Sequence, residues 1–290
     1  MLGLGIMGSA LSANLAAAGF EVIGWDPVPS CRARHRRNGG TVAEDVAQVA
    51  SACEFVITAL PSAQALDSVT AEILSAAKAR QVVIETSTLP IPAKESARKR
   101  LAKRGITLLD CPLSGTGAQA RAKDLVIYAS GPAAAIKRCA KVFAGFSRAS
   151  YDLGRFGNGS KMKFAANLLV AIHNVSAAEA IVMARKSGLD AKTAVKVLGD
   201  GAGASRMLQV RGPMMARRSY RDATMRMEIW QKDMAIIAQH LAALGSPAPL
   251  FQASRLVYDE AIRQGLAKAD TAAVCAVLES RARKPAKRAR

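Results

Sequence analysis

Three polar side chains fall on one face of an apolar stretch near the middle of the chain. Residues 160–187 contain neither Pro nor Gly and are dominated by Leu, Ile, Val, Met and Ala, which predicts one long helix that ends at Gly188. At about 100° per residue, Lys163, Asn167 and Asn174 lie within about 40° of one another. An ammonium group beside two amides can move a proton and hold a carbonyl oxygen. This polar stripe of three side chains faces either solvent, which is the commoner case, or a cleft where a ligand binds.

A glycine-rich loop at the start of the chain predicts a dinucleotide site. Gly3, Gly5 and Gly8 form GxGxxG, with Ile6 and Met7 inside the loop, and a helical pattern follows over residues 9–18. In this motif the glycines permit a tight turn, a close approach of the pyrophosphate and close packing of helix on strand. The free N–H groups and the dipole at the helix N-terminus favour the anion.

The next apolar run, EVIGWD, ends at Asp26, 18 residues after Gly8. A carboxylate at this strand end accepts hydrogen bonds from the adenosine ribose hydroxyls and repels a 2′-phosphate, so Asp26 favours NAD over NADP. Arg32 to Arg37 (RARHRR) lie just downstream and could instead hold a phosphate, which keeps NADP possible. We interpret this run as the exposed face of the following helix.

Strand and helix patterns alternate through the first half of the chain, which predicts an α/β domain. In such a sheet, ligands bind beyond the carboxyl ends of the strands. Hydroxyl and small residues stand at several of these ends, where the alternative is ordinary turn chemistry. The candidates are Leu60 and Pro61, Thr88, and the run Ser114, Gly115 and Thr116.

Only helical patterns follow the long helix, at residues 191–199, 223–244, 250–265 and 270–282. The predicted architecture is an N-terminal Rossmann-type α/β domain with a mostly parallel sheet (1–156) and an all-α C-terminal domain (157–280), joined by an interdomain helix (157–187). We expect substrate binding and subunit contacts in the helical domain. Only Met1 and Leu2 precede Gly3, so the central first strand is either completed by residues upstream or reduced to a stub.

The chain is strongly basic, with a formal net charge of +19 over 290 residues. Six positive residues lie in the last ten, residues 281–290, which lack apolar periodicity and are predicted to form a disordered tail. The excess favours anionic partners such as cofactor phosphates and substrate carboxylates, or simply marks an Arg-rich surface.

Cysteine and histidine patterns give no metal or disulfide site. The five cysteines are scattered without a CxxC pair, and the three histidines lie far apart. Unpaired cysteines fit a reducing cytoplasm. The uncharged residues 1–20 have the composition of a signal peptide, but they lack a basic start and carry the glycine loop instead. We therefore expect no membrane segment.

Four stretches together resemble the β-hydroxyacid dehydrogenases, the family of 3-hydroxyisobutyrate dehydrogenase, tartronate semialdehyde reductase and L-threonate dehydrogenase. GLGIMGSALSANL is similar to the family's cofactor loop, DCPLSGTGAQARAKDL to its substrate-binding stretch, GNGSKMKFAAN to its catalytic stretch and WQKDM to its C-terminal lysine motif. The resemblance covers nearly all of the chain except the basic tail. It implies an NAD(P)-dependent enzyme that acts on a small hydroxy acid or its semialdehyde.

By this resemblance, Lys163 takes the catalytic lysine position and Asn167 that of its partner amide. Ser114 and Gly115 take the positions that anchor a carboxylate, and Lys232 with Asp233 the motif beside the cofactor and the active site. Three changes depart from the family pattern: Thr116 replaces Gly, Lys123-Asp124 replaces Gly-Thr, and Ala166 replaces Asn. The first two changes lie at the substrate end and leave the substrate open.

The chemistry fits these residue types. Reduction of a carbonyl needs a hydride from nicotinamide and a proton on the oxygen. A lysine in a partly desolvated cleft exchanges a proton more readily than one in water, and its ammonium stabilises alkoxide charge. Lys161 points to another face and serves as a control. We expect a small anionic carboxylate as the substrate and a homodimer or homotetramer. The alternative from a different class is an inactive dehydrogenase-fold scaffold that binds nucleic acid or another partner through its basic surface. A third interpretation, within enzymes, is a glyoxylate or succinic semialdehyde reductase that prefers NADPH, and Asp26 weighs against it.

Overall fold

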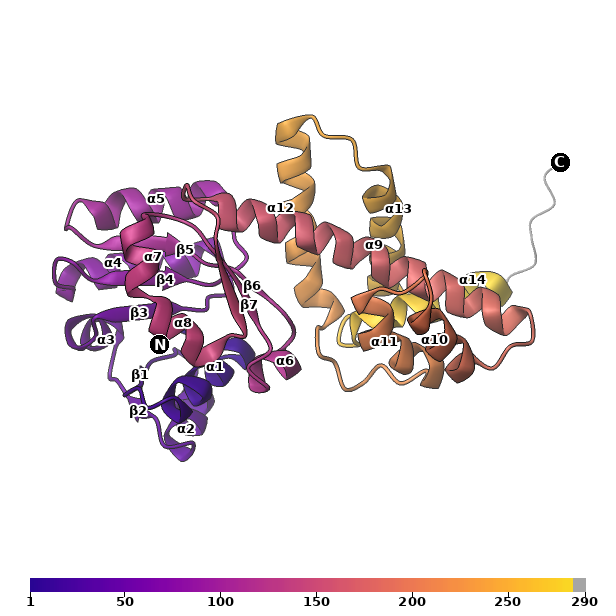
Figure 1. The fold of residues 1–290 in the computed structure, drawn as a ribbon, viewed down its shortest axis with the longest axis horizontal. Coiled ribbons are helices and arrows are strands. Elements are labelled where there is room, and N and C mark those ends of the chain that lie inside the picture. The colour runs from indigo at the N-terminus through magenta and orange to yellow at the C-terminus, as the bar shows by residue number, and fades with distance from the viewer. Residues whose placement is uncertain (284–290) are drawn as a thin grey trace. The chain divides into compact units, whose positions relative to one another are not determined.

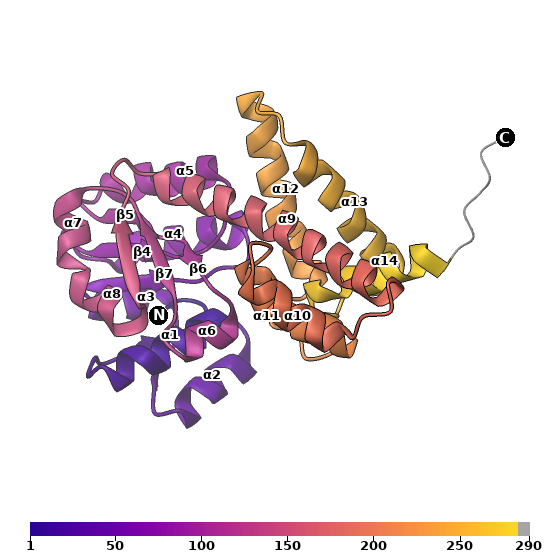
Figure 2. The same cartoon turned by 45° about the vertical axis from the view of Figure 1, so that its right-hand side comes forward.

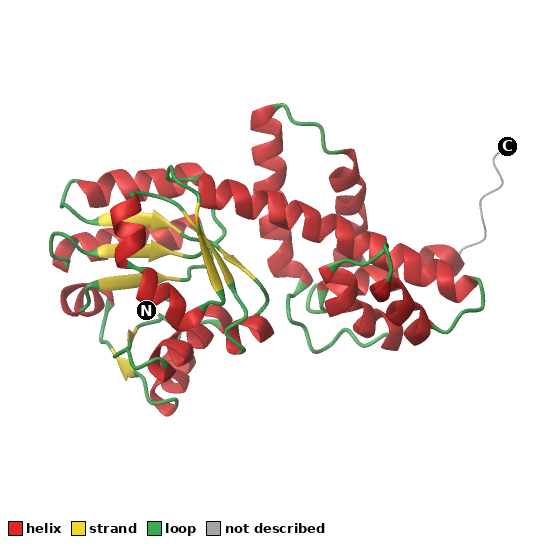
Figure 3. Ribbon diagram, in the orientation of Figure 1, coloured by secondary structure: helices red, strands yellow, loops and turns green. Residues whose placement is uncertain are grey.

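The computed structural model describes residues 1–283, and these divide into two compact units, the first over residues 1–164 and the second from residue 165 onward. Figure 3 shows that, within the described residues, the strands lie in the first unit and the second unit is helical. The predicted fold class is therefore confirmed: an α/β Rossmann-type unit with a mostly parallel sheet, followed by a helical unit.

The sheet of the first unit is built around residues that precede the glycine loop. Leu2 forms parallel bridges to Trp25 on one side and to Thr58 on the other. It therefore links two groups of parallel strands, β1 with β2 and β3 with β4 and β5. These strands are β1 (Ile23–Gly24), β2 (Thr41–Val42), β3 (Phe55–Thr58), β4 (Val82–Glu85) and β5 (Thr107–Asp110).

The two residues before Gly3 occupy the central position of this sheet as a stub. The Leu2 N–H donates to the Ile57 carbonyl at 2.8 Å, and the Ala59 N–H donates to the Leu2 carbonyl at 2.9 Å. The Met1 ammonium donates to the Ile23 carbonyl at 2.6 Å. Burial lowers the pKa of this amino group to about 6.

Alternating apolar residues along the strands build two cores, one on each face of the sheet. In β3, Val56 faces one core and Ile57 the other, and in β4, Val83 and Ile84 divide in the same way. Because side chains alternate along a strand, such continuously apolar strands must be covered on both faces. Helices α1, α7 and α8 cover one face, and α3, α4 and α5 cover the other.

The helices of the first unit surround the sheet as Figure 1 shows. A smaller group of strands extends it, with β6 antiparallel to β7 and β7 parallel to β8. The strands are β6 (Leu113–Ser114), β7 (Val126–Ala129) and β8 (Ala149–Asp152). The helices are α1 (Ile6–Ala17), α2 (Pro29–Arg37), α3 (Val46–Ala52), α4 (Ala63–Ala76), α5 (Ile91–Ala102), α6 (Gly117–Arg121), α7 (Ala133–Arg138) and α8 (Ala140–Phe146).

The predicted long helix is α9 (Asn158–Lys186), which has 29 residues and continues from the first unit into the second. Gly188 follows it with φ of +82°, as expected of a residue that ends a helix. Among the described residues, α9 is the one helix long and apolar enough to cross a membrane. It carries the buried amides of Asn167 and Asn174, whose hydrogen-bond partners lie within the protein.

The second unit contains one helix that sequence reasoning did not predict. Helix α11 continues through Gly212 and Pro213, residues that normally interrupt a helix. Its residue Arg211 is buried and donates to Asp270 at 3.2 Å, while Asp270 also accepts the N–H of Thr224 at 2.8 Å. This ion pair joins α11 to Asp270, the residue before the 3₁₀ turn, and Asp270 in turn binds Thr224 before α12. Such tertiary contacts can override poor local propensity.

The remaining helices of the second unit agree with the predicted ones within a few residues. Figures 1 and 2 both show α12 and α13 side by side. Helix α14 includes residues 281–283, which were predicted as part of the tail, and the predicted disorder of residues 284–290 lies outside the described residues. The helices are α10 (Ala191–Asp200), α11 (Arg206–Arg217), α12 (Met227–Leu244), α13 (Pro249–Arg263), the short 3₁₀ turn Thr271–Ala273 and α14 (Val274–Arg283).

Candidate active site

The glycine loop has the shape that a dinucleotide requires. A Cβ on Gly3 would lie 2.3 Å from the Ala59 carbonyl oxygen, and one on Gly8 would lie 1.8 Å from the Gly3 carbonyl oxygen. Gly5 has no atom within 4 Å of its Cβ position and is exposed. Packing thus requires glycine at positions 3 and 8, whereas Gly5 leaves open space above the start of α1. No side chain caps this helix start, so its N–H groups remain available to an anion. The residues fit a bound pyrophosphate.

Asp26 lies at the end of the strand that follows, with an exposed fraction of 7%. Its Oδ2 accepts the Leu4 N–H at 2.7 Å, and its Oδ1 accepts the Val28 N–H at 2.8 Å. These bonds fix the carboxylate beside the glycine loop and leave each oxygen a further lone pair. Arg34 on α2 donates to the Leu4 carbonyl at 2.6 Å, so part of the arginine run braces the loop.

The loops after β3 and β4 meet at the carboxyl edge of the sheet, as predicted. The Leu60 N–H donates to the Ser87 hydroxyl at 2.8 Å. Leu60 is buried, Pro61 is exposed, and Thr88 is partly exposed on the neighbouring loop. Since parallel strands present their carboxyl ends on one edge, this pair of loops lies on the same edge as Gly3 and Asp26.

The predicted carboxylate-anchoring run begins at the end of β6. Ser114 is partly exposed, and Gly115 has φ of +137°, which only glycine adopts readily. Thr116 caps α6 through a reciprocal pair of bonds with Gln119, so its side chain stabilises that helix. Lys123, which replaces the family's glycine, keeps the left-handed backbone conformation with φ of +58°.

Lys163 lies in the second turn of α9 and is partly exposed, whereas the control residue Lys161 is exposed. Asn167 follows Lys163 by one helical turn and is buried, with an exposed fraction of 4%. Its amide donates to the Asp233 carboxylate at 3.0 Å. The Lys232 ammonium lies 3.3 Å from the same carboxylate. Asp233 thus fixes Asn167, and this contact links the catalytic stretch with the C-terminal lysine motif.

Asn174 is fully buried in the second unit. Its amide nitrogen donates to the Thr271 carbonyl at 2.9 Å and to the Tyr258 hydroxyl at 3.0 Å, while its Oδ1 accepts no hydrogen bond. Burial raises the pKa of Tyr258 to about 12, so this hydroxyl stays protonated. The predicted stripe is therefore not a solvated face at Asn167 and Asn174, because both amides are enclosed.

Sequence reasoning missed a buried ionic cluster next to the catalytic stretch. Lys94 on α5 is fully buried, and its ammonium lies 2.6 Å from Glu85 and 2.8 Å from Asp110. Asp110 in turn accepts the Ser160 N–H at the start of α9, at 2.7 Å. The sequence signal was weak, since Lys94 stands in a helix rich in exposed basic residues.

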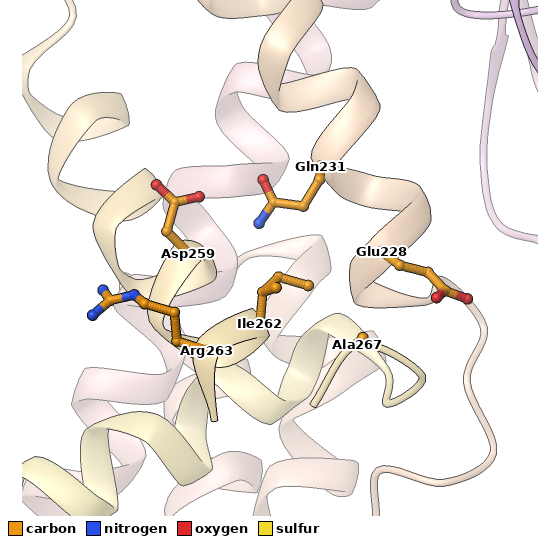
Figure 4. A pocket seen from close by; sticks show the side chains of 6 residues that line it. All are labelled: Glu228, Gln231, Asp259, Ile262, Arg263 and Ala267. Atoms are coloured by element: carbon orange, nitrogen blue, oxygen red, sulfur yellow. The ribbon is translucent and has the colours of Figure 1, made fainter. Parts of the chain in front are cut away.

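One hollow of about 500 Å³ lies elsewhere in the second unit, between α12 and α13. Figure 4 shows Gln231 extending from α12 toward α13, which carries Asp259 and Arg263. The hollow contains none of the predicted site residues, so we do not connect it with hydride transfer. Within residues 1–283, no group of three or more His, Cys, Asp or Glu side chains is placed to hold a metal ion.

Comparison with known protein families matches both parts of the chain. Residues 1–154 match the NAD binding domain of 6-phosphogluconate dehydrogenase. Residues 157–278 match the family described as the NAD-binding domain of NADP-dependent 3-hydroxyisobutyrate dehydrogenase. The two matches meet near the start of α9, where the loop after β8 leads into the catalytic stretch.

Curated relatives and solved structures agree with these matches. The chain is 31% identical to L-threonate dehydrogenase of Cupriavidus necator, over 94% of this chain and 93% of the relative. It is 30% identical to glyoxylate/succinic semialdehyde reductase 1 of Arabidopsis thaliana, over 94% of this chain and 95% of the relative. The crystal structure of 3-hydroxyisobutyrate dehydrogenase from Salmonella typhimurium is similar with a TM-score of 0.86 and 25% identity, covering 95% of this chain and 98% of that one.

Three independent features thus converge: a glycine loop that fits a pyrophosphate, a lysine one turn before a fixed amide on α9, and relatives that match over nearly the whole chain. The named relatives are dehydrogenases and reductases of small carboxylates. The resemblance inferred from the sequence is therefore confirmed. The chain belongs to the β-hydroxyacid dehydrogenase family of NAD(P)-dependent oxidoreductases.

Proposed function

We propose that this protein transfers a hydride between NAD and a small 3-hydroxy acid or its semialdehyde, with Lys163 as the general acid and base. The observation that carries the proposal is the pair on α9: a partly exposed lysine stands one turn before an amide that Asp233 holds in a buried hydrogen bond. A solvated lysine stripe would need no such fixed amide beside it.

When bound, the nicotinamide cofactor supplies or accepts the hydride. The glycine loop and the start of α1 hold the pyrophosphate, with Ile6 and Met7 beside it, and Asp26 orients the adenosine ribose. Lys163 gives a proton to the substrate oxygen during reduction and removes it during oxidation. Its charge also stabilises the alkoxide that forms in the transition state.

The other assigned residues complete the site. Asn167 orients Lys163 and the substrate oxygen, because its own position is fixed by Asp233. Ser114 and Gly115 anchor the substrate carboxylate, with Thr116 holding the loop through its helix cap. Cofactor contacts are assigned to Leu60, Pro61, Thr88 and Lys232. Asn174, a candidate substrate contact from the sequence, is fully buried against Thr271 and Tyr258, so we do not assign it to the substrate.

A panel of substrates with both cofactors tests the proposed activity. The oxidation panel is 3-hydroxyisobutyrate and L-threonate, and the reduction panel is glyoxylate and succinic semialdehyde, compounds that the names of the relatives contain. We expect the enzyme to turn over at least one of these compounds. The steady-state rate is measured from the change in NADH absorbance. A protein that binds NADH but turns over no member of the panel in either direction would contradict the proposed substrate class.

We propose NAD as the preferred cofactor, and an Asp26→Asn variant tests this. Loss of the carboxylate charge should lower the ratio of kcat/KM with NAD to that with NADP by roughly 10- to 100-fold, the usual worth of hydrogen bonds to a charged group. The measurement is kcat/KM for each cofactor, with the substrate held at the same concentration in both series.

Asp45→Asn is the matched control, because Asp45 also accepts a backbone N–H, that of Gln48 at 2.7 Å, at the start of α3. It should leave the cofactor ratio unchanged. A wild-type enzyme with higher kcat/KM for NADP, or an Asp26→Asn enzyme with an unaltered ratio, would overturn the assignment of Asp26.

The proposed setting is the cytoplasm, and the proposed assembly is a homodimer or homotetramer. All five cysteines are free, which fits a reducing compartment. We propose the domain limits 1–156 and 157–280, with 157–187 as the interdomain helix. No membrane or specific nucleic-acid partner is part of the proposal.

Deletion of residues 284–290 is expected to leave catalysis intact. The deletion keeps Arg281, which forms an ion pair with Glu260, and removes four positive residues. We expect kcat and KM within about twofold of wild type. Binding to duplex DNA should weaken and lose salt dependence, since each lost phosphate contact lowers the slope of log K against log salt by about 0.9.

A full-length variant with the four basic residues changed to Gln separates charge from length in this test. It should behave as the deletion does in both assays. Tight DNA binding that survives in both variants would favour the scaffold alternative. A kcat reduced more than fivefold would show that the tail contributes to the active enzyme.

A further inference from the structure

The first turn of α9 lies unusually close to two strands of the first unit. A Cβ on Gly159 would be 2.3 Å from the Tyr128 carbonyl oxygen and 2.6 Å from the Asp110 carbonyl oxygen. Real Cβ contacts of this length essentially do not occur, so only glycine permits the approach. The start of α9 is therefore set by the backbones of β7 and β5.

The N–H groups at this helix start are bound by side chains from the same two strand ends. The Gly159 N–H donates to the Ser130 hydroxyl at 2.9 Å, and the Ser160 N–H donates to Asp110 Oδ2 at 2.7 Å. The Ser160 hydroxyl donates to Asp110 Oδ1 at 2.8 Å. Asp110 thus binds both the main chain and the side chain of Ser160, where the helix dipole also favours an anion.

Lys94 also holds the Asp110 carboxylate in place, through the same oxygen that accepts the Ser160 hydroxyl. Its ammonium contacts Asp110 and Glu85 and donates to the Ser87 carbonyl at 2.7 Å. Burial by itself would lower the pKa of Lys94, but attraction to the two carboxylates outweighs it and raises the pKa above its usual value. The Lys94 ammonium therefore stays charged between the two carboxyl groups, and the N-terminus of α9 adds positive potential beside Asp110.

Such a cluster is a poor means of gaining stability. Removing charges from water costs several kcal/mol per ion, and well-packed apolar residues often stabilise a core as well or better. What the cluster does provide is a single geometry, because each carboxylate oxygen has a defined partner. Phe164, whose exposed fraction is 4%, anchors the next turn of α9. Lys163 lies between these two anchor points.

We propose that Asp110, Lys94 and Ser160 are positioning residues that fix the first turn of α9 and thereby the place of the Lys163 ammonium. The inference rests on the proposed role of Lys163. A shift of about 1 Å in a catalytic group can lower the rate by about 10²-fold, so a loosened helix start should affect kcat more than binding.

Ser160→Ala tests the proposal with little risk to folding, since it removes one hydroxyl and keeps the Ser160 N–H bond. Ser147→Ala is the matched control: Ser147 is also buried, and its hydroxyl donates to the Phe143 carbonyl at 2.8 Å, away from α9. We expect Ser160→Ala to lower kcat by roughly 10-fold or more, with the Kd of NADH unchanged. Ser147→Ala should keep wild-type kcat, and Ser160→Thr, which retains the hydroxyl, should recover most of the loss.

Hydrogen exchange gives a second result that does not depend on turnover. Ser160→Ala should speed exchange of the amides of residues 159–163 by roughly 10-fold, whereas Ser147→Ala should not alter them. Equal kcat and equal exchange in the two alanine variants would overturn the positioning role. If Lys163→Ala remained active while Ser160→Ala still sped amide exchange at residues 159–163, the proposed catalytic role of Lys163 would be wrong. The inference that Asp110, Lys94 and Ser160 fix the first turn of α9 would still hold.

Discussion

Lys163→Ala is expected to lower kcat by roughly 10²- to 10⁴-fold, the usual contribution of a positioned acid or base. The Kd of NADH should stay near the wild-type value, because the pyrophosphate is assigned to the glycine loop and not to α9. Steady-state rates with the best compound of the substrate panel and fluorescence titration with NADH measure the two quantities. The result would separate a catalytic lysine from a lysine that only binds cofactor.

Three further variants show whether Lys163 acts by transferring a proton or only by its positive charge. Lys163→Arg keeps the positive charge but does not release a proton near neutral pH, so it should be almost as slow as Lys163→Ala. Asn167→Ala should be intermediate, since it removes the amide that Asp233 holds and leaves the proton carrier. Lys161→Ala changes an exposed residue two positions away and should match wild type. Near-normal rates for all four variants would mean that Lys163 is a solvated lysine without a catalytic role. That result would contradict the proposed proton transfer.

The sequence was sufficient where one local pattern decides the structure. The apolar strands and the GxGxxG loop predicted the α/β unit, because periodicity and glycine spacing act over a few residues. The long Pro- and Gly-free run predicted α9 within a few residues of its observed bounds. Gly115 could be expected to stand in a turn, and its φ of +137° agrees.

The sequence was insufficient where distant residues override local preference. Lys94 stands in a helix rich in basic residues, yet its side chain is fully buried and its ammonium contacts Glu85 and Asp110 from two strands. Helix α11 contains Pro213, and tertiary contacts hold it in place, among them those of Arg211 with Asp270 and of Arg185 with the Met215 carbonyl. No periodicity in a single segment reports such pairs, since the partners are brought together by the tertiary fold.

The glycine loop allows folding and cofactor binding to be separated by two single substitutions. Gly8→Ala would place a methyl group 1.8 Å from the Gly3 carbonyl oxygen, in a position where backbone must move. We expect its melting temperature to fall by roughly 5 to 10 °C, as overpacking costs of 1 to 3 kcal/mol or more imply for a chain of this size. Gly5→Ala meets no atom within 4 Å and should fold as wild type.

Gly5→Ala should nevertheless raise the Kd of NADH by roughly 10- to 100-fold, because its methyl group enters the open space above the start of α1 where the pyrophosphate must approach. Gly199→Ala is the control, since Gly199 lies in α10 with open space around it and alanine favours a helix. It should keep wild-type affinity and lose no stability. Thermal unfolding without cofactor and NADH titration measure the two effects. If Gly5→Ala bound NADH as tightly as wild type, the pyrophosphate would have to lie elsewhere, and the assignment of the whole loop would be wrong.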